Sequence, residues 1–282
     1  MPFADEIHST NESFGELVLQ HTIEVAKQIF NSRLLATYAL GSLAHGGFST
    51  LVSDVDIAII IEDPITTNDI TKIHSIEESI KISAIPLAER LSIFWGSLTS
   101  LEGNDDIGRF PPLDKLDLIE NGRLLSGKEI RDALSIPTKM ELIVMGARFA
   151  LQMLNTPEIN NEITQPTLLS EKSIRHLTKI ILFPVRFLYT SLTGKIGHNR
   201  DAVEFYLTNN QGKKAKLVEA AFNWRSKQPE CKFETAQLMD EVLVELYIQF
   251  IDEYREKMID YNEIIIADDL RNWREVLIKH KA

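Results

Sequence analysis

Short apolar runs and turn residues divide the first half of the chain into predicted strands and helices. Residues 34–40 and 57–61 are apolar or β-branched and are bounded by turn residues, so they predict two neighbouring strands. Apolar residues recur at helical spacing over residues 16–30 and 68–82, which predicts two amphipathic helices that pack against the sheet. Residues 88–95 alternate between apolar and polar and predict a third strand. This order of elements indicates an α+β domain in which helices flank a sheet.

The second half of the chain has helical periodicity from Thr138 onward, except over residues 155–166, which are predicted to form a loop. The predicted helices cover residues 139–154, 171–192, 201–209, 213–226, 233–261 and 268–279. Residues 122–127, which begin and end with glycine, are predicted to lead the chain out of the first domain. We therefore expect an α+β domain over residues 1–136 and an all-α helical bundle over residues 137–282.

The composition is that of an ordinary globular protein, with 44% apolar and 25% charged residues over 282 residues. No stretch approaches the roughly 18 apolar residues of a membrane span, and the first residues carry no export signal, so we expect a cytoplasmic protein without a membrane partner. The single cysteine, Cys231, excludes an internal disulfide and a cysteine-cluster zinc site. The net charge of −11 would repel a phosphate backbone, so a cationic or neutral substrate fits better than nucleic acid.

The stretch between the first two predicted strands carries the residues best suited to chemistry. Gly41 allows a tight turn that approaches a ligand closely, and Ser42 is suited to cap a short helix whose amide groups would bind phosphate. Asp54 and Asp56 are two residues apart on a predicted strand, so their carboxylates share one face and could hold Mg²⁺. The simpler interpretation is a strand that ends in surface aspartates beside an ordinary glycine loop. The full pattern of strand, Gly-Ser turn, glycine pair, Ser-Asp-x-Asp and second strand favours a functional site.

A Gly-Ser turn followed by Asp-x-Asp at a strand resembles the signature of the DNA polymerase β-like nucleotidyltransferase superfamily. The resemblance implies a mixed sheet with flanking helices, two Mg²⁺ ions, and a third carboxylate on an adjacent strand. Glu89, at the beginning of the third predicted strand, fits the role of third carboxylate and of general base. The alternative for Glu89 is a surface glutamate paired with Arg90. Weaker candidates, which lie in a polar loop or near a helical segment, are Asp105, Asp106, Asp114 and Asp117.

The helical half is similar to that of aminoglycoside adenylyltransferases of the streptomycin and spectinomycin 3''-type. The similarity rests on an Arg-containing helix, a Thr-Gly-Lys-Ile turn at residues 193–196 and a basic residue before Asp-Ala, together with the Gly-Gly pair and the serine before Asp-x-Asp in the first half. The resemblance implies that ATP is the co-substrate and that Asp54, Asp56 and Glu89 ligate magnesium. The nucleotide-binding residues that it implies are Gly41, Ser42, Ser53, Lys195, Arg200 and Trp224. The alternatives are an exposed turn lysine for Lys195 and a buried helix aromatic for Trp224.

The acceptor is defined less closely than the donor. Where the resembled family grips the aminoglycoside with a tryptophan and an acid, this chain has Leu113 and His176, and Glu171 is an acid close to the second position. The resemblance implies transfer of AMP from ATP to a hydroxyl of a small molecule, with aminoglycoside resistance as one possible role. The first alternative is a protein side chain or a tRNA end as acceptor, and the tRNA case would need a basic patch around Arg175, Lys179 and Arg186. The second is a non-catalytic nucleotide-binding or antitoxin-like protein. These motifs do not encode the acceptor's identity, the nucleotide preference or the oligomeric state.

Overall fold

The computed structural model describes residues 3–103 and 107–281, with side chains described from Phe14 onward. The chain divides into two compact units, Met1–Pro137 and Thr138–Ala282, and each unit has its own apolar core. Asp105 and Asp106, two of the weaker candidates in the sequence, lie outside the described residues. Among the residues described, no helix is both long and apolar enough to cross a lipid bilayer.

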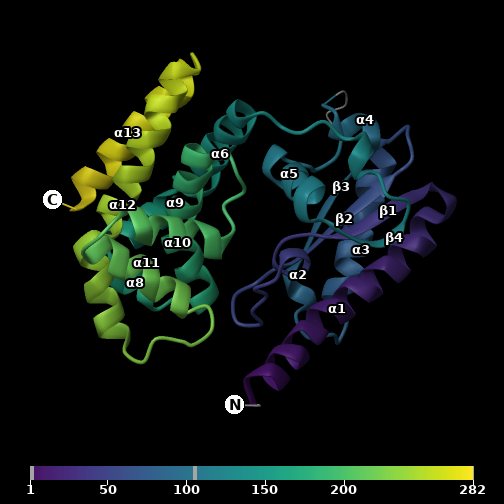
Figure 1. Ribbon diagram of the computed structural model, residues 1–282, viewed down its shortest axis with the longest axis horizontal. Coiled ribbons are helices and arrows are strands. Elements are labelled where there is room, and N and C mark those ends of the chain that lie inside the picture. Colours follow the sequence, from purple (N-terminus) through teal and green to yellow (C-terminus); the bar gives the residue numbers. More distant parts are fainter. Residues whose placement is uncertain (1–2, 104–106, 282) are drawn as a thin grey trace. The chain divides into compact units, whose positions relative to one another are not determined.

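The first unit is built on a mixed sheet of four strands among its described residues (Figure 1). The strands are β1 (Leu34–Ala39), β2 (Val55–Ile61), β3 (Leu91–Gly96) and β4 (Arg123–Gly127). Their order is β3-β2-β1-β4, with β1 antiparallel to both β2 and β4, and β2 parallel to β3. The helices of this unit are α1 (Phe3–Phe30), α2 (Ser42–His45), α3 (Thr67–Lys81), α4 (Leu98–Leu101) and α5 (Pro112–Asn121). The fold class is therefore α+β, as the sequence predicted.

Alternate side chains of the sheet enter two different apolar clusters. Val55 and Ile57 are fully buried on the face that is covered by α1 and α3 (Figure 1). Ala58 is buried on the opposite face, in the cluster that includes Leu118 of α5. Because successive strand residues point to opposite faces, Asp56 shares the α5 face with Ala58.

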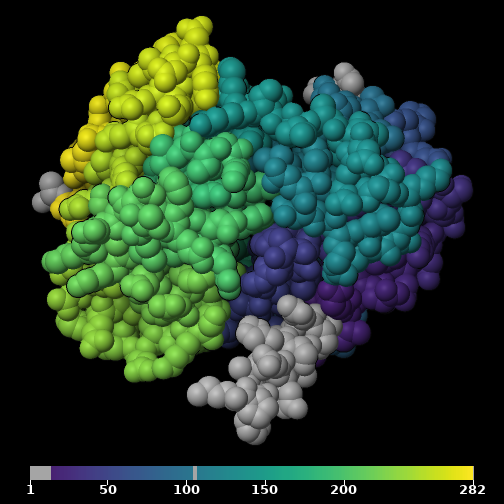
Figure 2. All heavy atoms as spheres, viewed as in Figure 1, coloured from purple at the N-terminus to yellow at the C-terminus, as the bar shows by residue number. Residues whose placement is uncertain are grey.

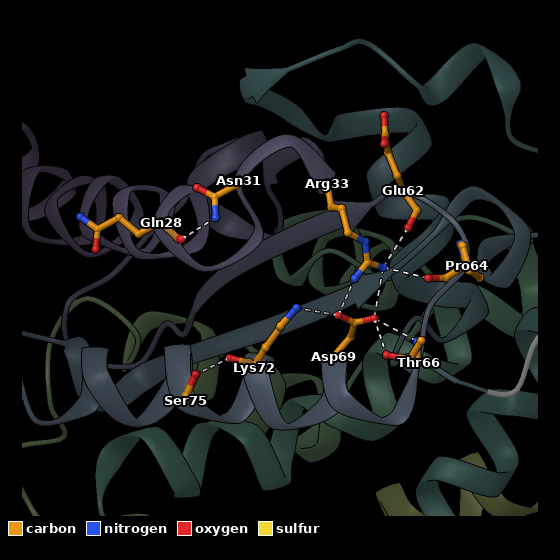
Figure 3. Close-up of polar contacts among 9 residues, drawn as sticks. All are labelled: Gln28, Asn31, Arg33, Glu62, Pro64, Thr66, Asp69, Lys72 and Ser75. Atoms are coloured by element: carbon orange, nitrogen blue, oxygen red, sulfur yellow. Dashed lines mark hydrogen bonds and ion pairs between the residues drawn. The ribbon is translucent and has the colours of Figure 1, made fainter.

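A partly buried ion pair ties the ends of β1 and β2 to the start of α3 (Figure 3). Arg33, directly before β1, donates from Nη1 to Asp69 Oδ1 at 2.8 Å and from Nη2 to the carbonyl oxygens of Glu62 and Pro64 at 3.1 and 2.8 Å. Asp69 is fully buried and also accepts hydrogen bonds from the amide and hydroxyl of Thr66 at 2.9 and 3.0 Å, within the capping box of α3. This network satisfies the buried carboxylate and fixes one end of the central strand pair.

The first unit differs from the sequence prediction in three places. Residues 122–127 do not lead the chain out of the domain but contain strand β4, whose residues are mostly exposed or half-buried and so lack an apolar run. The third strand begins at Leu91, because the residues Ala88–Arg90 form a 3₁₀ helix. The first helix begins at Phe3, well before the predicted residue 16.

The second unit is all-helical among its described residues. Its helices are α6 (Lys139–Met153), α7 (Pro157–Thr164), α8 (Pro166–Ser170), α9 (Ile174–Thr193), α10 (Asn199–Asn209), α11 (Lys213–Asn223), α12 (Lys232–Asp260) and α13 (Ile264–Lys281). α13 packs along α12, and its yellow side chains form a ridge on the surface of this unit in Figure 2. The prediction of a loop over residues 155–166 is wrong, because α7 occupies most of this segment. The hydroxyl of Thr156 accepts a hydrogen bond from the Ile159 amide at 3.3 Å, and Pro157 stands in the first turn.

Candidate functional site

The connection between β1 and β2 brings Gly41 against Asp56. Gly41 has a φ of +59° and is the N-cap of α2, so Ser42, predicted to be the cap, is the first residue of that helix. Oδ2 of Asp56 lies 2.6 Å from the position that an ideal Cβ on Gly41 would take. The amide of Leu40 donates to the carbonyl oxygen of Asp56 at 3.0 Å. A residue with a side chain would be strained at Gly41 and would displace the Asp56 carboxylate.

Asp54 and Asp56 flank the first residue of β2. Asp54 directly precedes the strand and Asp56 is its second residue. Val55 between them is fully buried in the cluster on the α1 and α3 face. Because neighbouring residues of an extended chain alternate, the two carboxylates lie on the opposite face, where both are half-buried. The structure thus brings Gly41 and Asp56 together and places Asp54 directly before the same strand, with carboxylate oxygens of the kind that a hard cation prefers.

Ser53 and Arg90 fix the loop that leads to the aspartates. Ser53 is 6% exposed, and its hydroxyl oxygen accepts a hydrogen bond from the Ser49 amide at 3.0 Å. Arg90 donates from Nη1 to the carbonyl oxygen of Thr50 at 2.6 Å. These contacts show that the Ser53 side chain supports the loop before Asp54, and its contact with phosphate stays a prediction.

Glu89 lies outside β3, in the 3₁₀ helix Ala88–Arg90. Its side chain is 66% exposed, and its Oε1 lies 3.4 Å from Nε of Arg90, which is the pairing that the sequence offered as the alternative. The register of the parallel strands pairs Asp56 with Ser92, so Ser92 is the β3 residue beside Asp56. The role of Glu89 as third carboxylate stays a prediction.

Asp117 of α5 contacts the turn directly, although the sequence ranked it among the weaker candidates. Its Oδ2 accepts a hydrogen bond from the Gly41 amide at 2.8 Å, and its Oδ1 accepts one from Nδ2 of Asn121 at 3.0 Å. Its exposed fraction is 8%, and a ring nitrogen of His45 lies within 4.8 Å of one carboxylate oxygen. The sequence showed only that Asp117 precedes Leu118, a core residue of a helical segment, and gave no signal for its contact with Gly41.

A buried lysine holds α5 in place. Nζ of Lys115 donates to Oε1 of Glu102 at 2.8 Å and to the hydroxyl of Ser135 at 3.0 Å, and Lys115 is 7% exposed. The hydrogen bond from Lys115, followed by that from Ser135, lowers the pKa of Glu102 to about 2. This network joins α5 to the end of α4 and to the segment after β4, and so fixes the helix that carries Asp117.

Three of the predicted nucleotide-binding residues belong to the second unit. Lys195, in the turn after α9, and Arg200, in the first turn of α10, are exposed. Trp224 caps the C-terminus of α11 and packs, partly buried, against the helical core. The next residue, Arg225, was not predicted, and burial together with the nearby guanidinium of Arg186 lowers the pKa of Arg225 to about 10. Arg225 directly follows Trp224 in the chain.

The carboxylates around the predicted acceptor position are paired with basic side chains. Nε2 of His176 lies 2.6 Å from Oε2 of Glu162, which is 2% exposed, and Nζ of Lys172 lies 2.9 Å from the other oxygen. Glu171 forms an ion pair with Lys232 at 2.6 Å. His176 is thus engaged in pairing a buried acid, and Glu171 is paired across the unit with α12.

An α+β first unit followed by an all-helical second unit defines the fold of the described residues. A solved structure with this fold is the crystal structure of spectinomycin adenyltransferase AAD(9) from Enterococcus faecialis with ATP and spectinomycin. The likeness has a TM-score of 0.56 and 14% sequence identity, and it covers 81% of this chain and 98% of that chain. No protein-family model and no curated protein matches the chain. At this identity the likeness concerns the fold, and it extends over almost all of the enterococcal protein.

Proposed function

We propose that this chain is a Mg²⁺-dependent nucleotidyltransferase of the cytoplasm that transfers AMP from ATP to a hydroxyl of a small-molecule acceptor. The observation that carries the proposal is the contact of Gly41 with Asp56, on the sheet face that Asp54 shares. A carboxylate pair beside a glycine turn leaves space for a phosphate and a cation at the same point. The shared fold with an adenyltransferase whose structure includes ATP supports ATP as the donor.

The residues present fit a magnesium site. Asp54 and Asp56 supply oxygen ligands from one face, both are half-buried, and Gly41 has no side chain to fill the space at Asp56 Oδ2. When bound, Mg²⁺ neutralises charge on the phosphates and aligns the attacking and leaving oxygens, and two such ions serve this reaction class. Asp54, Asp56 and Glu89 are the residues that we assign to holding the metal.

The remaining residues are assigned to the nucleotide and to the proton. Gly41, Ser42 and Ser53 are assigned to the phosphates from the first unit. Lys195 and Arg200 supply positive charge from the second unit, and Trp224 supplies an aromatic face for the base. The acceptor oxygen attacks the α-phosphorus, the bond to pyrophosphate breaks, and Glu89 takes the hydroxyl proton.

The acceptor is assigned to the class of neutral or cationic hydroxyl compounds. The net charge of −11 disfavours tRNA. Of the three residues that a tRNA-binding patch would need, Arg186 already donates from Nε to the Gly197 carbonyl oxygen at 2.6 Å. The basic partners of Glu162 and Glu171 reduce the negative charge available to an amine-bearing sugar. We therefore test aminoglycosides as one group of acceptors among several and do not assume that they are the substrate.

The test is an acceptor screen with ATP labelled on the α-phosphate. The full-length protein is incubated with Mg²⁺ and streptomycin, spectinomycin, other hydroxyl compounds, tRNA or total cell protein, and D54N serves as the inactive control. Label on a small molecule supports the proposal. Label only on protein or on tRNA would show that the acceptor is a macromolecule and not a small hydroxyl compound. ATP binding by calorimetry without any transfer or pyrophosphate release would leave a non-catalytic nucleotide-binding protein.

A further inference from the structure

We propose that Asp117 is a positioning residue of the donor site, which holds the Gly41 amide and thereby fixes the Asp56 carboxylate. The inference rests on the proposed function, because it assigns Asp56 to the reaction. It adds a residue from helix α5 to a site otherwise formed by the sheet and its connections.

The contacts form a chain of two steps. Oδ2 of Asp117 accepts a hydrogen bond from the Gly41 amide at 2.8 Å. Oδ2 of Asp56 lies 2.6 Å from the place where a Cβ on Gly41 would stand. A shift of the Gly41 backbone would therefore change its contact with the Asp56 carboxylate and let that carboxylate move. The hydrogen bond from Gly41 to Asp117 has a charged acceptor, which makes it stronger than one between neutral groups.

The placement of Asp117 favours positioning over direct metal binding. Both of its oxygens already accept hydrogen bonds within the unit, one from Gly41 and one from Asn121 at 3.0 Å. The residue is 8% exposed, so its oxygens are largely withdrawn from solvent. A buried carboxylate is costly unless hydrogen bonds compensate it, and these two bonds supply that compensation.

The rest of the unit explains why this role falls to α5. The β3 residue beside Asp56 is Ser92, so the neighbouring strand provides no carboxylate at that register position. Lys115, two residues before Asp117, anchors α5 through Glu102 and Ser135. A rigidly held helix can set the position of a turn more accurately than a loop can.

The experiment compares D117A, D117N and D117S in the full-length chain, with E120Q as the matched control. Glu120 is an exposed carboxylate on the same helix, and its change removes the same charge from α5. The amide introduced by D117N can still accept from Gly41, whereas D117A cannot, and D117S is a second truncation in case D117A does not fold. The readouts are the hydrogen-exchange rate of the Gly41 amide, binding of Mn²⁺ as a probe of the metal site, and kcat and KM for ATP.

We expect the truncations to speed exchange of the Gly41 amide and to lower kcat by about tenfold to a hundredfold, the loss equivalent to one hydrogen bond to a charged group. D117N should recover most of that loss. It should also keep an affinity for Mn²⁺ close to that of the wild type, whereas the truncations should weaken Mn²⁺ binding because they free the Asp56 carboxylate to move. A Mn²⁺ affinity that falls as much in D117N as in D117A would overturn positioning in favour of direct metal binding. Unchanged Gly41 exchange in both truncations, or unchanged kcat in them, would also overturn it. If the wild type transfers no nucleotide, the proposed function fails, while the exchange measurement still decides whether Asp117 holds Gly41.

Discussion

Asp56 and Ser92 are register partners in the parallel pair of β2 and β3, so a hydroxyl, and not a carboxylate, lies beside Asp56 on the neighbouring strand. Glu89, the acid predicted for this role, is placed three residues earlier, in a 3₁₀ helix, with its side chain 66% exposed. The contribution of Glu89 is therefore the most informative point to test by mutation.

Replacing Glu89 by Gln removes the predicted base and third ligand. Under the proposed mechanism kcat should fall by about 10²- to 10⁴-fold, the usual contribution of a general base, and the acidic limb of the pH–rate profile should change. Steady-state kinetics of E89Q, E89D and the control E120Q measure this. A wild-type kcat in E89Q would remove Glu89 from the site and leave Asp54 and Asp56 as its acids.

Replacing Gly41 by Ala tests the close contact with Asp56. The added methyl group would meet Oδ2 of Asp56 at 2.6 Å, and the backbone would be strained at a φ of +59°. We expect kcat/KM to fall by about tenfold or more, with about 1–3 kcal/mol lost from the free energy of unfolding. Gly46→Ala is the matched control, because Gly46 also has a positive φ, of +91°, but nothing lies within 4 Å of its ideal Cβ. Equal losses of activity in both variants would show that backbone strain alone, and not the Asp56 contact, is responsible.

Replacing Asp54 or Asp56 by Asn keeps the size of the side chain and removes one negative charge. Each variant should lose pyrophosphate release almost completely, because an amide is a poor ligand for Mg²⁺ compared with a carboxylate. Circular dichroism should show an unchanged fold, since both side chains are half-buried and lie outside the apolar clusters. Turnover at the wild-type rate in either purified variant would refute the metal assignment.

Replacing Glu102 by Gln tests the network that holds α5. The folded-state pKa of Glu102 is lowered from 4.5 to about 2, so its stabilising effect is present above the unfolded pKa and is lost as pH falls through the folded value. We expect E102Q to lower the free energy of unfolding by about 1–3 kcal/mol at pH 7, because Lys115 keeps its burial but loses its charged partner. The difference from wild type should shrink as pH falls from 4.5 towards 2. Urea unfolding at several pH values measures it, and a difference that is independent of pH would contradict the assignment.

The two central strands were predictable because burial on both faces leaves a continuous apolar run. β2 is buried at every position except Asp56, and the sequence found both this strand and the position of its carboxylate. β4 could not be found in the same way, since it lies at the edge of the sheet, where Arg123 and Leu124 are exposed. α7 was missed because its polar residues are buried through hydrogen bonds, such as Trp273 Nε1 to Asn160 Oδ1 at 2.8 Å, which a hydrophobicity pattern does not record.

The site was predictable as far as it depends on short stretches of sequence. Gly41, Asp54 and Asp56 lie within sixteen residues of one another in the sequence. The two-residue spacing of Asp54 and Asp56 predicts that their side chains share one face of the sheet. The contact of Asp117 with Gly41 joins residues 76 positions apart, so it depends on how α5 packs on the sheet. Periodicity showed that α5 is a helix but gave no information about which turn its carboxylate would meet.

The strand order links the stability of the candidate site to that of the whole first unit. Residues 40–54 of the site join β1 and β2, and these two strands occupy the interior positions of the sheet, each paired on both sides. Separating the two ends of this segment requires breaking the central ladder, which in a cooperative unit coincides with global unfolding. Amides of β2 should therefore be among the slowest in the chain to exchange with solvent. Local fraying at the edge strand β4 can then proceed while Asp56 keeps its register with Ser92.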